Sequence, residues 1–360
     1  MKKEFKFGNL LVNPNVFMSP MHGVTDSPFR RLIQELSGNR CSLLVTEFVA
    51  MESLLRGGKI EKEQMRFLEE ERPLGIQVFG ADPELMEEGA KLVLQENPNF
   101  LELNAGCPAP KVVKRGGGSS LLVDLPRMRD IVRRLRGLTD LPFSVKVRLG
   151  WDEEDINVLK VLEMVQEEGA DLFIIHGRTR MQGYKGTASW DWIQKAHEIS
   201  DIPIVGNGDI KQVSDVERRL KETGVDGVSV GRGVMHNPWL FGQVADFYET
   251  GQWSAPSLEE QTKVYHRFGQ LQLDYGHSEL RAIGKLKQFT ARMTKCFPHW
   301  KGMRQTLLRA ETLADFLKLV DDHSQKIEQE FGGSPFVPEE VQNLNGGKEN
   351  AIVSGRDFKK

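Results

Sequence analysis

Eight short apolar segments recur along the first 231 residues, and each is followed by a loop and then by a helical stretch. They span residues 15–19, 43–48, 74–79, 100–104, 143–149, 171–176, 202–206 and 226–231. Strands that are apolar throughout and alternate with amphipathic helices form a parallel sheet covered on both faces. Eight such units within about 250 residues predict an α/β fold of the (β/α)8 TIM-barrel type.

A doubly wound open sheet is the competing α/β fold. It is disfavoured by the number of segments, by their even spacing, and by the lack of a Gly-x-Gly-x-x-Gly motif after the first one. The amphipathic stretches between the strands include 26–36, which opens with a capping Asp, as well as 83–95 and 152–168. The chain therefore favours a closed barrel.

The alternating pattern ends at the sequence QWSAPS, residues 252–257. Only helical segments follow, up to about residue 331. We predict a barrel domain over 1–250 and a smaller all-helical C-terminal domain over 251–335. Residues 336–360 are polar and rich in glycine, so we expect a flexible tail there.

Composition limits the classes of partner and compartment. The formal net charge is −3, so contact with a nucleic acid requires a local basic patch. Three cysteines, Cys41, Cys107 and Cys296, are too few for a disulfide framework. The chain has no signal-peptide pattern, no membrane-length apolar run and no zinc-ligand spacing. We expect a cytoplasmic protein, a monomer without metal or membrane attachment.

Polar and reactive residues follow the predicted strands, where barrel enzymes carry their chemistry. Those that come to this rim are Pro20, Met21, Glu47, Gln77, Asn104, Cys107, Lys146, Arg148, His176, Arg178, Arg180, Asn207, Asp209 and Arg232. Because every strand contributes to one edge, their convergence predicts an active site.

The loops after the last two strands suggest a phosphate site. They read Gly206-Asn207-Gly208-Asp209 and Gly231-Arg232-Gly233. Glycines allow the backbone to approach a phosphate closely, and an arginine adds a bidentate donor. Each motif could instead be a tight turn, but their occurrence on adjacent strands favours phosphate.

Three side chains within strands suit a polar heterocycle. Lys146 lies in an otherwise apolar strand, where a lysine needs a polar cavity or an ion pair. His176 ends the sixth strand and could donate to a cofactor carbonyl, and the Gln77 amide could bond to the edge of a ring. The alternatives are an ion-paired lysine and a structural histidine or glutamine.

Cys107 follows the fourth strand in a loop bounded by glycine and proline. A cysteine at this rim could be a nucleophile or a proton donor. The nearby Arg115-Gly-Gly-Gly-Ser-Ser run lacks the Gly-Lys-Ser/Thr of a P-loop, which excludes that class of nucleotide hydrolysis.

The C-terminal domain contains a cationic segment without any Asp or Glu. Its basic residues are Arg281, Lys285, Lys287, Arg292, Lys295, Lys301, Arg304 and Arg309, with Phe289, Phe297 and Trp300 between them. Such a segment is typical of a surface that binds a polyanion, although a solvated basic face is the alternative. Lys111, Lys114 and Arg115 would add cations at the barrel mouth.

Several motifs together resemble the tRNA-dihydrouridine synthases, FMN-dependent barrel enzymes that reduce uridine in tRNA. They occur in family order over residues 19–241 and include SPMHGVTDSPFR, LELNAGCPAPKVVKRGGGSSLL, IIHGRTRMQGYKGTASWDWI, VGNGDI and GVSVGRGVMHNPWLF. The Cys-Pro loop with its following lysine, combined with His-Gly-Arg-Thr-Arg, distinguishes this family from other flavin barrels. Ser19 and His22 depart from the usual pattern, and neither change removes a reactive group.

The resemblance implies roles for individual residues. FMN would contact Pro20, Met21, His22, Gln77, Lys146 and His176, and its phosphate would contact Asn207, Gly208, Asp209, Gly231 and Arg232. The tRNA would contact Asn104, Lys111, Arg178, Arg180, Arg281, Lys285 and Lys287. NADPH would be the reductant, and Cys107 would protonate C5 of the uridine.

Two other classes of function are compatible with parts of the sequence. A flavin barrel that reduces a free pyrimidine would not need the cationic segment. An RNA-binding protein with an inactive barrel would not need the reactive residues at the rim.

Overall fold

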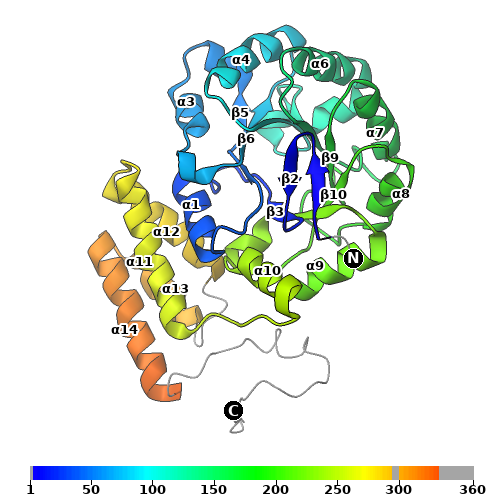
Figure 1. Ribbon diagram of the computed structural model, residues 1–360. Helices are drawn as coiled ribbons and strands as arrows, with labels where there is room; N and C mark the ends of the chain where they lie inside the picture. The colour runs from blue at the N-terminus through cyan, green and yellow to red at the C-terminus, as the bar shows by residue number, and fades with distance from the viewer. Residues whose placement is uncertain (1–2, 294–299, 332–360) are drawn as a thin grey trace. The chain divides into compact units, whose positions relative to one another are not determined.

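The computed structural model describes residues 3–293 and 300–331 (Figure 1). The chain divides into two compact units, Met1–Trp253 and Ser254–Lys360. The predicted tail over 336–360 lies outside the described residues, as do Lys295, Cys296 and Phe297.

The first unit is a parallel β-barrel surrounded by helices (Figure 1). Its strands, in sheet order, are β3 (Val16–Met18), β11 (Gly227–Val230), β10 (Ile204–Asn207), β9 (Leu172–His176), β8 (Phe143–Arg148), β7 (Phe100–Ala105), β6 (Leu74–Phe79) and β4 (Leu44–Val45). Ser42, just before β4, donates to the Val16 carbonyl oxygen of β3 at 3.1 Å. The predicted TIM barrel is confirmed.

The second strand of the barrel is divided, whereas the sequence predicts one strand over 43–48. β4 ends at Val45, and β5 (Val49–Ala50) resumes the pairing with β6. Between them, the Thr46 hydroxyl accepts from the Gln77 backbone N–H at 3.2 Å and donates to the Glu47 backbone carbonyl at 2.8 Å. The strand breaks because this side chain replaces a backbone partner.

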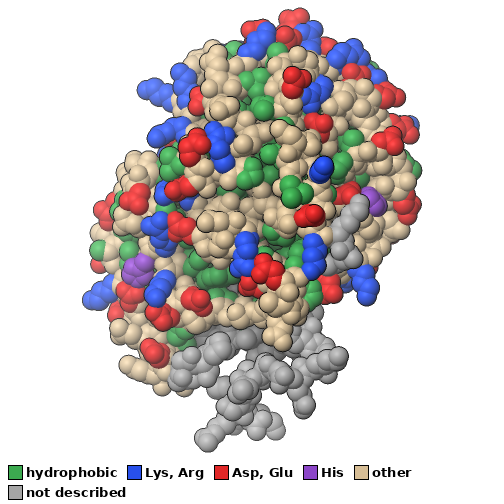
Figure 2. Space-filling model, viewed as in Figure 1, with side chains coloured by type: hydrophobic (Ala, Val, Ile, Leu, Met, Phe, Trp, Pro, Cys, Tyr) green, Lys and Arg blue, Asp and Glu red, His purple; other side chains and the backbone are tan. Residues whose placement is uncertain are grey.

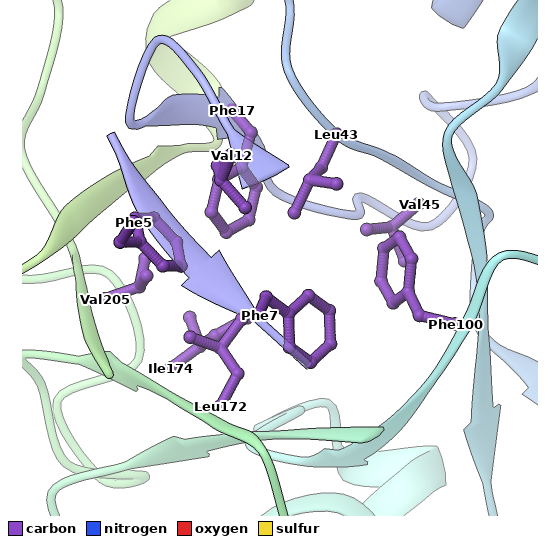
Figure 3. Packing of buried hydrophobic residues seen from close by; sticks show 10 residues of the cluster. All are labelled: Phe5, Phe7, Val12, Phe17, Leu43, Val45, Phe100, Leu172, Ile174 and Val205. Atoms are coloured by element: carbon purple, nitrogen blue, oxygen red, sulfur yellow. The ribbon is translucent and has the colours of Figure 1, made fainter. Parts of the chain in front are cut away.

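An antiparallel hairpin of β1 (Phe5–Phe7) and β2 (Leu10–Val12) lies across the N-terminal end of the barrel. Figure 3 shows its side chains pointing into a cluster of Phe5, Phe7, Val12, Phe17, Leu43, Val45, Phe100, Leu172, Ile174 and Val205. The rings of Phe7 and Phe100 meet edge to face at 5.2 Å. The sequence analysis missed this hairpin, which fills the lower barrel with apolar side chains.

The interior-facing positions change from apolar to polar along each strand, because alternate residues of a strand face the same side. On β7 the series is Phe100, Glu102 and Asn104, and Phe100 and Glu102 are at most 1% exposed. The register places Glu102 beside Gln77 of β6 and Ser144 of β8. The upper half of the barrel is therefore lined by hydrogen-bonding groups.

The outer helices are α1 (Ser27–Leu36), α2 (Met51–Leu55), α3 (Lys59–Met65), α4 (Pro83–Gln95), α5 (Pro110–Val113), α6 (Leu125–Gly137), α7 (Val158–Glu167), α8 (Asp191–Ile199), α9 (Val213–Thr223) and α10 (Leu240–Thr250). Short 3-10 helices span Glu69–Glu71, Gly118–Val123 and Arg232–Met235. Asp26 caps α1 by accepting from the Phe29 amide at 3.1 Å, as predicted.

The helix predicted over 152–168 begins later than expected. The Asp152 carboxylate accepts from the amides of Glu154 and Asp155 at 3.2 and 3.0 Å, which forms a local turn. α7 begins only at Val158. Asp152 competes with the helix for these donors, so the first turn of the predicted helix does not form.

The second unit contains α11 (Leu258–Asp274), α12 (Glu279–Met293), α13 (Trp300–Arg309) and α14 (Leu313–Phe331). Ser257 and Glu260 form a capping box at the start of α11. The ring of Phe289 packs against Tyr265 and Phe268, at centroid distances of 5.8 and 5.4 Å. Phe289 is therefore a core residue, and its proposed place on a polyanion-binding surface is wrong.

Figure 2 shows the face on which the hairpin lies, where acidic and basic side chains are mixed. Within residues 3–293 and 300–331, every helix is too short or too polar to cross a membrane.

Candidate functional site

The polar upper half of the barrel brings the predicted strand-end residues together. Adjacent strands place Asn104 beside Lys146, and His176 beside both Arg148 and Asn207. These side chains belong to β7, β8, β9 and β10. Their convergence follows from the barrel, since parallel strands all end at one rim.

Asn207 links three strands through its amide. Its Nδ2 donates to the Ser229 carbonyl at 2.7 Å and to the Ser19 hydroxyl at 3.1 Å. Its Oδ1 accepts from Lys146 Nζ at 3.3 Å. The Asn207 side chain therefore orients Lys146 within the site.

Glu102, which is fully buried, and Lys146, which is half-buried, interact as opposite charges inside the barrel. Burial raises the pKa of the Glu102 carboxyl to about 7, although Lys146, Gln77 and Ser144 favour its ionised form. Burial lowers the pKa of Lys146 to about 8, where Glu102 favours the cation and Arg148 opposes it. Both groups titrate near neutral pH because desolvation works against their attraction.

His176 is neutral at physiological pH. Burial holds its pKa well below the usual range, and the surrounding cations lower it further. Arg178 approaches His176 Nε2 at 3.4 Å, and a guanidinium can only donate. The imidazole proton therefore resides on Nδ1, and that nitrogen is the donor.

Arg178 is almost completely buried, at 2% exposure, and its guanidinium holds the loop after β9. It contacts both Asp209 oxygens at 2.8 and 2.9 Å and the carbonyl oxygens of Lys185 and Gly186 at 3.1 and 2.6 Å. Asp209 also accepts from the Ala188 amide at 2.8 Å. Arg178 thus ties the loop after β9 to the loop after β10.

The loop after β10 requires glycine at position 208. Gly208 has φ of 131°, and a Cβ there would lie 2.6 Å from the Ala188 Cβ. Asp209 follows with φ of 55°, a conformation that Asp tolerates. This part of the motif is a strained turn, and its main chain rather than the Asp209 carboxylate is available to a ligand.

Tyr184 lies at the same rim, where it contacts two arginines. The guanidinium carbon of Arg232 is 4.4 Å from the ring centroid, and that of Arg148 is 5.4 Å away. Arg232 is thereby close to the residues of β8 and β9. A Cβ at Gly231, one residue earlier, would make only ordinary van der Waals contact, with Ser19 Cβ nearest at 3.8 Å.

The loop that carries Cys107 is fixed by Asn104. Asn104 Oδ1 accepts from the amides of Gly106 and Cys107 at 3.1 and 2.9 Å. The Cys107 carbonyl accepts from the Ser119 hydroxyl at 2.9 Å. Burial raises the pKa of the Cys107 thiol, against smaller opposing effects of the Ala109 backbone and Arg148, so the thiol stays protonated at neutral pH.

The loop after β3 places Pro20, Met21 and His22 at the rim, before α1. The His22 side chain is 59% exposed and stacks on Phe48 at 4.6 Å. Its Nδ1 lies 3.5 Å from a Glu47 oxygen, which also accepts from the Gly23 amide.

The predicted tRNA-binding residues are dispersed. Lys111 is exposed on α5, and the Arg180 guanidinium packs over the Trp151 ring at 4.6 Å. On α12 of the second unit, Arg281 is exposed, whereas Lys285 and Lys287 are half-buried. Their roles stay predictions.

Comparison with known proteins decides the family. The family described as "Dihydrouridine synthase (Dus)" matches residues 17–331. "Probable tRNA-dihydrouridine synthase 1" of Synechocystis sp. is 33% identical over 320 residues, 89% of either chain. The chain belongs to the dihydrouridine synthase family. The predicted family and the expectation of an enzyme of this family are confirmed.

Other members of the dihydrouridine synthase family are similar along most of their length. A "Probable tRNA-dihydrouridine synthase" of Aquifex aeolicus is 31% identical over 86% of this chain and 96% of its own. "tRNA-dihydrouridine synthase B" of Shewanella oneidensis is 32% identical over 74% of this chain and 84% of its own. The match thus includes the helical unit as well as the barrel.

Solved structures of low sequence identity share the barrel of this chain. A 2-naphthoyl-CoA reductase has a TM-score of 0.52 at 13% identity, and covers 69% of this chain and 52% of its own. Histamine dehydrogenase from Rhizobium sp. 4-9 has a TM-score of 0.50 at 14% identity, and covers 75% of this chain and 50% of its own. These likenesses concern the fold, and the chain spans about half the length of either protein.

Glu102 and Tyr184 lie in this candidate site and were not singled out from the sequence. Glu102 alternates with Phe100 and Asn104 on one strand, so the period of two could have placed it in the barrel interior. Tyr184 lies in a loop, for which no periodicity exists. Within residues 3–293 and 300–331, no cluster of three His, Cys, Asp or Glu side chains could hold a metal ion.

Proposed function

We propose that this protein is a tRNA-dihydrouridine synthase that reduces the C5=C6 bond of uridine in tRNA, with FMN as cofactor and NADPH as reductant. The observation that carries the proposal is the family match over residues 17–331, which includes both units. The donor and acceptor groups at the barrel rim support it independently.

The residues at the rim fit a flavin. An isoalloxazine ring presents carbonyl oxygens and ring nitrogens, which require donors. Lys146 Nζ and the neutral imidazole of His176 supply these, and Asn207 and Arg178 hold them in place. When bound, FMN would supply hydride for C6 of the uridine after its own reduction by NADPH.

The FMN phosphate would be held at the ends of β10 and β11. Arg232 supplies a cation, and the main chain of Gly208, Asp209 and Gly231 would supply amides. Asp209 acts through its backbone because its carboxylate is paired with Arg178. Pro20, Met21 and His22 would border the ring from the loop after β3, and Gln77 would contact its edge.

Cys107 would transfer its thiol proton to C5 of the uridine. Its raised pKa keeps the proton on sulfur at neutral pH, as a proton donor requires. Asn104 holds the loop and would face the substrate base. The base must leave its stack to reach the rim, as enzymes acting on nucleobases require.

The cations of both units would contact the tRNA backbone. Lys111 and Arg180 would do so beside the barrel mouth. Arg178, whose buried guanidinium is paired with Asp209, would act near the base by holding His176 and the loop after β9. Arg281, Lys285 and Lys287 of α12 would contact phosphates that lie outside the catalytic site. A phosphate-binding surface of this kind positions the RNA without reading its sequence.

An absorbance spectrum of the purified protein, followed by anaerobic addition of NADPH, tests the cofactor. We expect the spectrum of an oxidised flavin, which NADPH bleaches. The cofactor released from the denatured protein should be FMN. Mass spectrometry of nucleosides from tRNA incubated with the reduced enzyme then tests the substrate. Reduction of free uridine, but not of tRNA, would contradict the proposal and favour a small-molecule reductase. A colourless protein that does not take up FMN would refute the cofactor.

A further inference from the structure

A series of hydrogen bonds through three side chains, Glu102, Gln77 and Asn104, leads from the barrel interior to the Cys107 loop. Gln77 Nε2 donates to Glu102 Oε1 at 2.6 Å. Asn104 Nδ2 donates to Gln77 Oε1 at 2.8 Å. Asn104 Oδ1 then accepts from the amides of Gly106 and Cys107. Glu102 is completely buried, and Gln77 is 1% exposed.

The Glu102 carboxyl, at the inner end of this series of hydrogen bonds, determines the direction of each of the other bonds. Above its pKa of about 7, the Glu102 carboxyl is ionised and only accepts, so the NH2 of Gln77 must face it. The Gln77 oxygen must then face Asn104, whose NH2 turns inward and whose oxygen turns to the loop. With the opposite orientation, Asn104 would present its NH2 to two backbone N–H groups, and both would lose their acceptor.

The surroundings of Glu102 favour its role as acceptor. Ser144 donates to the second carboxylate oxygen at 3.2 Å. Lys146 is the nearby cation, and Arg148 opposes its charge from the next interior position of β8. The carboxylate therefore has a donor at each oxygen and a compensating positive charge.

We infer that Glu102 is a positioning residue, whose buried carboxylate orients the amides of Gln77 and Asn104 and thereby fixes the loop that carries Cys107. The expected effect of Glu102 on catalysis by Cys107 rests on the proposed function. The effect on the loop does not require substrate, so it can be measured separately.

Glu102→Gln tests the inference because an amide can either donate or accept. The side-chain amides of Gln77 and Asn104 can then turn over. In the molecules where they do so, the backbone amides of Gly106 and Cys107 lose their acceptor. We expect iodoacetamide to alkylate Cys107 about fivefold faster at pH 7.5, the factor that corresponds to one hydrogen bond. The pH midpoint of alkylation should also fall, because a looser loop leaves the thiol better solvated. Mass spectrometry of the Cys107 peptide separates this thiol from Cys41 and Cys296.

The double variant Gln77→Glu with Glu102→Gln is the rescue. The carboxylate at position 77 accepts from both neighbouring amides, so Asn104 keeps its orientation. We expect the alkylation rate to return to within about twofold of the unchanged chain. Flavin affinity should stay reduced, because the Gln77 amide is lost. Ser144→Ala is the matched control, since it removes the other bond to Glu102 and leaves the Gln77 bond intact.

The catalytic readout is single-turnover reduction of tRNA by the flavin-loaded enzyme. Glu102→Gln should lower the single-turnover rate at saturating tRNA about fivefold. The affinity for tRNA should change less, because Asn104 is the only assigned tRNA contact that the variant perturbs. Unchanged Cys107 alkylation in folded Glu102→Gln protein would overturn the inference. If Glu102→Gln does not fold, Glu102→Asp replaces it. Its side chain is one methylene too short for the bond to Gln77, so it should also raise the rate of Cys107 alkylation, and an unchanged rate would overturn the inference. If the unchanged chain forms no dihydrouridine, the proposed function fails, while the alkylation data still test Glu102.

Discussion

At the scale of residues, burial and neighbouring charge determine which groups carry protons in this site. The Cys107 thiol has a raised pKa, so it retains its proton. Burial, assisted by the charges of Arg148, Lys146, Arg178 and Arg232, lowers the pKa of His176 and keeps its imidazole neutral. At neutral pH the site thus combines a neutral donor thiol and a neutral imidazole with several cations, which suits an anionic cofactor.

Replacement of Cys107 by Ala should remove the proton donor while leaving flavin bound, because the flavin contacts lie on other strands. We expect kcat for uridine reduction to fall about 10²- to 10⁴-fold, the usual contribution of a positioned general acid. Steady-state dihydrouridine formation and the flavin content per chain would be measured together. Normal turnover by a yellow Cys107→Ala enzyme would contradict this role.

The affinity for FMN should fall as the pH rises through about 8, the pKa to which burial lowers Lys146. Lys146 is cationic below this pH and neutral above it. The FMN phosphate, whose second pKa is about 6, stays ionised between pH 7 and pH 9 and adds no pH dependence. We expect the Kd to rise roughly tenfold between pH 7 and pH 9, as a charged hydrogen bond is lost. Flavin fluorescence titration measures it. Lys146→Met should bind weakly at both pH values, and a persisting pH dependence would implicate another group.

At the scale of elements, the N-terminal hairpin closes the barrel end opposite the site. Phe7 is fully buried against Phe100, so Phe7→Ala leaves a cavity in the lower barrel. We expect the free energy of unfolding to fall by about 3–5 kcal/mol. Leu11→Ala, at a position 56% exposed on the same hairpin, should change it by less than about 0.5 kcal/mol.

Urea denaturation followed by tryptophan fluorescence would compare the two hairpin variants. FMN affinity of folded Phe7→Ala protein should stay unchanged, because apolar residues at the bottom of the barrel are separated from the polar layer above. Loss of flavin from a folded Phe7→Ala protein would show that the hairpin also shapes the site.

At the scale of the whole molecule, the barrel holds the reactive groups, and α12 of the helical unit holds cations that we assign to tRNA. Charge reversal of Arg281, Lys285 and Lys287 to Glu should raise the KM for tRNA and flatten its dependence on salt, since fewer phosphate contacts release fewer counterions. Each lost contact should lower the slope of log affinity against log salt by about 0.7–0.9.

The matched control reverses Lys318 and Lys326 on α14, both of which are exposed. This double variant changes charge on the same unit but outside the cationic segment, and it should leave the slope nearly unchanged. Equal effects of the two sets would indicate a general influence of net charge rather than a binding surface. Flavin bleaching by NADPH should stay normal in both.

The sequence by itself determined the barrel and the strand ends that form its rim. Eight apolar strands alternating with helices have one closed arrangement, and the parallel direction of the strands brings Gln77, Lys146, His176 and Asn207 to one edge. These predictions succeeded because periodicity and chain direction are local properties of the sequence.

Only the tertiary structure decided how these residues are connected. The break at Thr46 depends on a backbone amide of a neighbouring strand. The hairpin at Phe5–Val12 depends on a cavity lined by side chains from Phe17 to Val205. The sequence predicts that Arg178 contacts the tRNA, and only the structure shows that its guanidinium is buried and paired with Asp209. Glu102 reaches the Cys107 loop through partners on two strands. Hydrogen-bond direction, desolvation and charge pairing depend on neighbours distant in the chain, which a linear pattern does not specify.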